Sequence, residues 1–157
     1  MSSEAPQPKA LARIPDDINI LLADSVISHK DGKISVIGLF QVILVQQFPA
    51  AHRALTVVVE MSCGVGTQHW TLDVVNPEKE KIHSMRGEVL LRKYADKHNI
   101  IALIPDLPLE GEGEWHLEFG IDGQVLKTRK FFVQKAPAPL PPGRGPEWKR
   151  LDDPGLR

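Results

Sequence analysis

Apolar and polar residues alternate along most of the chain with the spacing of β-strands rather than that of helices. Proline, glycine and Asn-Pro pairs separate the alternating segments, as turns do in antiparallel sheets. We therefore predict an all-β antiparallel sandwich of about seven to eight short strands. The segments that carry this pattern are residues 18–28, 33–46, 54–60, 67–75, 99–104, 114–121 and 124–133. Residues 87–97 suit either a strand at an irregular edge or a short helix, and we favour the strand.

Two Asp-Gly pairs, Asp31-Gly32 and Asp122-Gly123, each lie between two apolar segments. Asp-Gly in that setting predicts a hairpin with a two-residue type I′ turn, which also fixes the register of the two strands. The second turn would place Phe119 opposite Leu126. One face of that hairpin is then apolar, while the other carries the acidic residues and a histidine. The two sets are Trp115, Leu117, Phe119 and Ile121, and Glu112, Glu114, His116 and Glu118.

The first hairpin is apolar on both faces. A two-residue turn at Asp31-Gly32 would pair Val26 with Ile37 and Ala23 with Phe40, and the following strand continues the pattern. A sandwich buries only the inner face of each sheet, so the outer face needs a second cover. Three explanations are open. Another segment of the chain folds over the face, the face is an interface with a second copy or a partner, or a bulge at Gly38 changes the register.

Composition divides the chain into three parts. Residues 1–16 contain three prolines among small and charged residues, which predicts a flexible leader. Residues 17–135 form the β-sandwich domain. Residues 136–157 contain six prolines, too many for a helix or a central strand, so we expect an extended, proline-rich C-terminal tail.

Charge and cysteine content narrow the class of protein. The 157 residues carry a formal net charge of −1 and the pI is about 6.6, which argues against a nucleic-acid partner. The single Cys63 excludes an intramolecular disulfide, and the N-terminus lacks the apolar core of a signal peptide. No apolar run is long enough to span a bilayer. We therefore predict a cytoplasmic protein with no membrane partner.

The hairpin residues resemble the opening of a family of small bacterial β-proteins of unknown function. The resemblance rests on Asp24-Ser25-Val26, Asp31-Gly32-Lys33, Val36-Ile37-Gly38 and Gln47-Phe48-Pro49. The later stretch from Leu107-Pro108 to Ile121-Asp122-Gly123 resembles the terminal hairpin of that family and of immunoglobulin-like sandwiches. The resemblance covers about residues 18–133 and implies an immunoglobulin-like fold. It implies no catalytic residues.

Candidate chemistry is sparse. The six histidines are dispersed without the close pairing that a zinc site on one element needs. Cys63 has no base beside it, so a thiol nucleophile is not indicated. The carboxylates of residues 110–118 alternate along a strand and could bind Ca²⁺ or act as an acid and base pair. The expected register places Lys127 opposite Glu118, so a solvated face with cross-strand ion pairs is the simplest explanation. We predict no catalytic residue, no cofactor and no metal site.

The tail carries two interaction signals. Pro139-Leu140-Pro141-Pro142-Gly143-Arg144 has the form of a polyproline ligand for an aromatic groove. Trp148 and Leu151, in an otherwise polar terminus, could anchor the tail on the protein's own sheet or on a neighbour.

These observations predict a non-enzymatic binding or assembly module with a protein partner or a homo-oligomeric state. The contact would use the apolar sheet and the tail. Its candidate residues are Ile37, Leu39, Ile43, Val45, Trp148 and Leu151. The alternative is a ligand-binding or enzymatic domain with a site in the loops at one end of the sandwich, near His52, His98 and Asp106.

Overall fold

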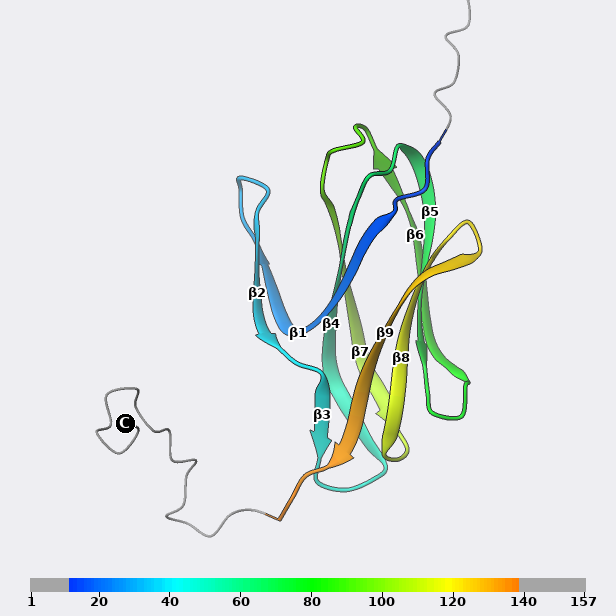
Figure 1. The fold of residues 1–157 in the computed structure, drawn as a ribbon. Helices are drawn as coiled ribbons and strands as arrows, with labels where there is room; N and C mark the ends of the chain where they lie inside the picture. Colours follow the sequence, from blue (N-terminus) through cyan, green and yellow to red (C-terminus); the bar gives the residue numbers. More distant parts are fainter. Residues whose placement is uncertain (1–11, 139–157) are drawn as a thin grey trace, which may run out of the picture.

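The computed structural model describes residues 12–138, and the described chain is all-β. Figure 1 shows the strands of this range, labelled and coloured in chain order. They are β1 (Asp17–Ser28), β2 (Ile34–Leu39), β3 (Val42–Val45), β4 (Ala50–Ser62), β5 (Gly66–Val75), β6 (Lys81–Leu91), β7 (His98–Leu109), β8 (Gly113–Ile121) and β9 (Gln124–Lys135).

The strands form two sheets. The four-stranded sheet has the order β2-β1-β4-β7 and the five-stranded sheet has the order β3-β9-β8-β5-β6. The four-stranded sheet is curled like half of a barrel, and its β1–β2 hairpin stands away from the other sheet (Figure 1). Both sheets contribute alternate residues to one buried core, because side chains along a strand point to opposite faces. Leu22, Val57 and Ala102 enter this core from the four-stranded sheet, and Leu72 and Phe119 from the other.

The chain changes sheets within the segment 33–46, which we expected to be one strand. Its first half is β2, at the edge of the four-stranded sheet, and its second half is β3, at the edge of the five-stranded sheet. At the crossing, the Phe40 amide donates to the Leu22 carbonyl at 3.1 Å, and the Phe132 amide donates to the Gln41 carbonyl at 2.9 Å. β3 then runs parallel to β9, with Val42 opposite Phe132. The prediction of a wholly antiparallel fold is therefore wrong at this one pair.

The first Asp-Gly hairpin has a different turn from the expected one. The Gly32 amide donates to the His29 carbonyl at 3.0 Å, and the His29 amide donates to the Lys33 carbonyl at 2.9 Å. Only Gly32 has a positive φ, of 83°, so the loop has three residues and ends in a glycine bulge. The longer loop moves the register by one residue. Ala23 therefore lies opposite Leu39 instead of Phe40.

The second hairpin has the expected turn. Asp122 and Gly123 both have positive φ, of 50° and 82°, as a type I′ turn requires. The register changes between Phe119 and Gly120, where a bulge moves Lys127 opposite Phe119. The faces follow the prediction, because the bulge lies on β9 and leaves the alternation of β8 intact. The inward residues Trp115, Leu117, Phe119 and Ile121 are all buried.

Strand β6 begins before the segment in which we expected it. It starts at Lys81 and ends at Leu91, so only part of the segment 87–97 is a strand. Trp70 packs over Gly87 on the neighbouring strand: a Cβ added to that glycine would lie 2.6 Å from the Trp70 ring. Glycine thus leaves room for an aromatic ring on the sheet.

Candidate interaction surface

The outer face of the four-stranded sheet is apolar. Core residues Leu22, Val57 and Ala102 point inward, so the residues that alternate with them point outward. The register aligns these outward residues in cross-strand rows. One row is Leu39–Ala23–Thr56–Leu103, the next is Leu21–Val58–Ile101, and Ile37 extends the surface along β2. We refer to these eight residues as the apolar face.

The rim residues of the apolar face are exposed, whereas its centre is shielded. Leu39 is 62% exposed and Leu103 is 57% exposed. Val58 and Ala23 are fully buried although they do not belong to the core between the sheets. Neighbours on the same face therefore cover the central positions, and the exposed leucines leave an apolar surface that faces solvent.

The outer face of the five-stranded sheet carries ion pairs. The buried Asp73 carboxylate accepts a hydrogen bond from the Ser84 hydroxyl at 2.5 Å and lies 2.7 Å from the Lys81 ammonium. The hydrogen bond that Lys81 donates to Asp73 is the main cause that raises the pKa of Lys81 above its ordinary value, and the charge of Asp73 adds to it. Ion pairs of this kind suit a surface in contact with water, so the two outer faces differ in chemistry.

Glu114 is a second ion-pair centre on the outer face of the five-stranded sheet. Its carboxylate lies 3.0 Å from Lys130 Nζ and 3.1 Å from His116 Nε2. The hydrogen bond from Lys130 is the main cause that holds the pKa of Glu114 below its ordinary value, while desolvation opposes the shift. A cross-strand ion pair is thus present on this face, but at Glu114 and Lys130. The pairing expected between Glu118 and Lys127 is wrong, because the bulge in β9 places Thr128 opposite Glu118.

A polar cavity of about 320 Å³ lies at one end of the four-stranded sheet. Glu60 accepts a hydrogen bond from Asn19 at 3.2 Å and lies 3.1 Å from Lys97 Nζ. Ser62 donates to Asp17 at 3.0 Å. Each charged group here has a partner, so the cavity forms a polar end to the apolar face.

The structure places the predicted contact residues in two different settings. Ile37 and Leu39 lie on the apolar face and are 47% and 62% exposed. The prediction that Ile43 and Val45 share this sheet face is wrong, because β3 belongs to the other sheet. Ile43 is only 4% exposed, and Val45 packs against the core. Trp148 and Leu151, with the rest of residues 139–157, lie outside the described residues.

Sequence reasoning missed the contribution of β7 to the apolar face. Ile101 and Leu103 alternate with the core residues Ile100, Ala102 and Ile104. The signal was present, because the run Ile100–Ile104 is apolar at every position and so offers no polar face to water. β4 lies between β7 and the β1–β2 hairpin and pairs with both β7 and β1. The sequence does not specify this order of strands.

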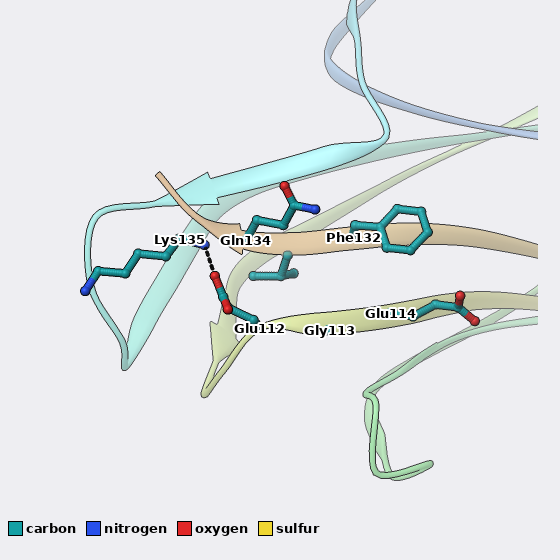
Figure 2. A pocket seen from close by; sticks show the side chains of 7 residues that line it. Glu112, Gly113, Glu114, Phe132, Gln134 and Lys135 are labelled. Carbon is teal, nitrogen blue, oxygen red and sulfur yellow. Dashed lines mark hydrogen bonds between the residues drawn. The ribbon is translucent and has the colours of Figure 1, made fainter. Parts of the chain in front are cut away.

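A depression of about 420 Å³ lies where β8 begins and β9 ends (Figure 2). Glu112, Glu114 and Phe132 are among the residues that line it. The backbone amide of Lys135 donates to Glu112 Oε1 at 2.6 Å. Glu112 and Glu114 therefore both have hydrogen-bond or ion-pair partners.

Of the residues proposed for an alternative loop site, His98 lies apart from His52 and Asp106. His98 lies opposite Met61 and His52 opposite Leu107, which are opposite ends of the β4–β7 ladder. His52 instead packs against Phe40, with ring centroids 5.8 Å apart. Within residues 12–138, no three His, Cys, Asp or Glu side chains are grouped so that they could hold a metal ion.

The single thiol lies at the turn between β4 and β5. Cys63 is half-buried, has a φ of 64°, and donates its backbone amide to the Tyr94 carbonyl at 2.9 Å. A hydrogen bond with Cys63 raises the pKa of Tyr94, and Arg13 lies 4.6 Å from the centre of the Tyr94 ring. Arg13 also exchanges two backbone hydrogen bonds with Val65. These contacts fasten the segment before β1 to the turn.

The model of a family of unknown function, DUF6941, matches residues 19–134, which include all the strands except the first two residues of β1 and the last residue of β9. No curated protein matches the chain. Among the described residues, no helix is long and apolar enough to cross a membrane.

Proposed function

The chain belongs to the DUF6941 family of unknown function, so we propose its role from its surface: it is a non-enzymatic assembly module whose apolar face packs against the same face of a second copy. The observation that carries this proposal is the contrast between two outer faces. Leu39 and Leu103 project from the apolar face of one sheet, while Asp73, Lys81 and Glu114 form ion pairs on the other sheet.

A second copy suits the apolar face better than a charged partner. None of the eight residues carries a charge, so the face offers no ion-pair partner to an acidic or basic surface. A two-fold axis places the same apolar rows against each other, which makes the surface self-complementary. Two sheet faces pack about 10 Å apart with interdigitated side chains, as in the core of a β-protein. The exposed Leu39 and Leu103 provide the projecting side chains for such packing.

We also propose that the fold is related to the immunoglobulin fold and that the protein is cytoplasmic. An immunoglobulin-like relationship is supported by the strand orders β1-β4-β7 and β9-β8-β5, which match A-B-E and G-F-C of that fold. The β2 strand is then an addition to that pattern. A cytoplasmic location stays a prediction from the sequence, as does the contribution of the tail through Trp148 and Leu151.

The test of the apolar face is Leu103→Glu in the full chain. A carboxylate at this position would have to be desolvated inside the interface, so the variant should halve the number of chains in the assembly. Light scattering coupled to size exclusion measures the molar mass. Leu90→Glu is the matched control, because Leu90 is a leucine with 53% exposure on β6 of the other sheet. It should leave the mass unchanged.

If Leu103→Glu has the molar mass of the wild type at every concentration, the apolar face is not the interface. A mass that falls equally in both leucine variants would indicate a general effect of added charge.

A further inference from the structure

The four edge strands of the described sheets differ in how they are protected. β7 carries Pro105 and Pro108, which lack the amide that an added strand needs. β6 carries charged residues at Lys81, Arg86 and Glu88, and β3 has only four residues. β2, with the sequence ISVIGL, has neither proline nor charge. Among residues 12–138, β2 is therefore the edge that is open to another strand.

The backbone of β2 shows which groups point outward. His29 and Lys33 form a hydrogen-bonded pair at the base of the loop. Hydrogen-bonded and non-bonded pairs alternate along an antiparallel ladder, so Ile27–Ser35 and Ser25–Ile37 are the next bonded pairs. The amides and carbonyls of Ile34 and Val36 point away from β1 instead. In the described part of the chain, no strand lies beyond them.

Side chains on both faces of the hairpin support the addition of a strand. Ile27 and Ile37 are 49% and 47% exposed on the outer side, while Val26 and Val36 are only half-buried on the inner side. The hairpin stands away from the five-stranded sheet at this point (Figure 1). An added strand would contribute alternate side chains to each of these surfaces.

We propose that β2 pairs antiparallel with β2 of a second copy, about a two-fold axis at Val36. The axis is perpendicular to the sheet, so the two four-stranded sheets become one eight-stranded sheet with both apolar faces on the same side. Val36 of each copy then exchanges two hydrogen bonds with the other. Gly38, with a φ of 68°, bends the edge and limits the paired segment to the residues before it.

This inference rests on the proposed function for its final stoichiometry. Edge pairing joins two copies, and the doubled apolar face then packs against the face of another such pair. The two two-fold axes are perpendicular, so the assembly closes at four chains.

The test is Val36→Pro in the full chain, with Val36→Ala as the matched control. Proline removes the outward amide without removing a hydrogen bond to β1, whereas alanine shortens the side chain and keeps the amide. Val36→Pro should halve the molar mass of the assembly, and Val36→Ala should leave it unchanged. Hydrogen exchange provides a second measurement, because the Val36 amide of the wild type should be protected only at concentrations where the chains associate.

The outcomes separate the two interfaces. A wild-type dimer that Val36→Pro dissociates and Leu103→Glu does not supports edge pairing and overturns the apolar-face interface. A dimer that only Leu103→Glu dissociates, with rapid exchange at the Val36 amide, overturns edge pairing and supports the proposed function. A monomer at all concentrations overturns both.

Discussion

Single residues on the two outer faces differ in what surrounds them. The Asp73 side chain is only 8% exposed, and the Ser84 hydroxyl and the Lys81 ammonium compensate its charge. Leu103 occupies a comparable outward position on the other sheet and faces solvent. The partners of Asp73 stabilise its charge where it lies. Covering the exposed Leu103 side chain, by contrast, would lower the free energy because it removes apolar surface from water.

Glu114 gives a prediction about pH. Its pKa in the folded state lies below the ordinary value of 4.5, so its charged form stabilises the fold above that pH. The stabilisation is lost as the pH falls through the lowered pKa. We expect the free energy of unfolding to decline below about pH 5, and Glu114→Gln to remove part of that decline. Urea denaturation at several pH values measures it.

Lys130→Gln is the companion variant, because the hydrogen bond from Lys130 is the main cause of the lowered pKa. It should reduce the pH dependence in the same direction as Glu114→Gln. If Glu114→Gln keeps the full wild-type dependence on pH, Glu114 does not contribute to it.

At the scale of elements, the two Asp-Gly pairs show that one dipeptide can form two turns. Asp122 adopts a positive φ and completes a two-residue turn. Asp31 has no positive φ, and Gly32 alone provides the left-handed residue of a three-residue loop. The Asp31 side chain instead accepts a hydrogen bond from the Lys33 amide at 3.1 Å. This local contact favours the longer loop.

Gly32→Ala should reduce the free energy of unfolding by about 1 kcal/mol, because alanine is strained at positive φ. No atom lies within 4 Å of the added Cβ, so backbone strain is the only cost. Chemical denaturation measures the change. Gly111→Ala is the control: it too has open space but no positive φ, and it should have little effect. Equal losses in both variants would contradict the role of the turn conformation.

The sequence predicted the strands better than their pairing. Alternation at Trp115–Ile121 identified the inward face correctly, because one buried face imposes a period of two. The change of sheet after Leu39 could not be predicted, since β2 and β3 are both apolar and either continuation buries similar side chains. Strand β6 was missed at its start, where Lys81, His83 and Ser84 conceal the inward positions.

The sequence predicted only part of the apolar face, because the pairing of distant strands could not be predicted. Ile37 and Leu39 follow from a hairpin that is apolar on both faces. Ile101 and Leu103 join them only through β4, and that contact between distant segments is a property of the folded sheet. Ile43 was misplaced because its sheet was misassigned.

At the scale of the whole molecule, the two sheets share one core and have opposite outer faces. One outer face carries ion pairs, and the other is apolar and lies next to an unprotected edge strand. Association through such a surface depends on apolar burial rather than on charge. The molecule is thus asymmetric across its thickness.

Salt provides a test at this scale. Raising NaCl from about 0.05 to 0.5 M shortens the screening length severalfold, which weakens exposed ion pairs. The dissociation constant of the apolar-face contact should not increase, because no charged residue belongs to that face. Sedimentation velocity over a range of concentrations measures it. A marked weakening by salt would indicate an ionic interface instead.

The parallel β3–β9 pair also bears on how the chain folds. It joins Val42 to Phe132, residues that lie 90 positions apart in the sequence, so β3 cannot enter its sheet until β9 has formed. Closing so long a loop has a large entropic cost before any contact offsets it, and proteins rich in such contacts fold in milliseconds to seconds. A nascent chain would therefore hold β3 unpaired until β9 had been synthesised.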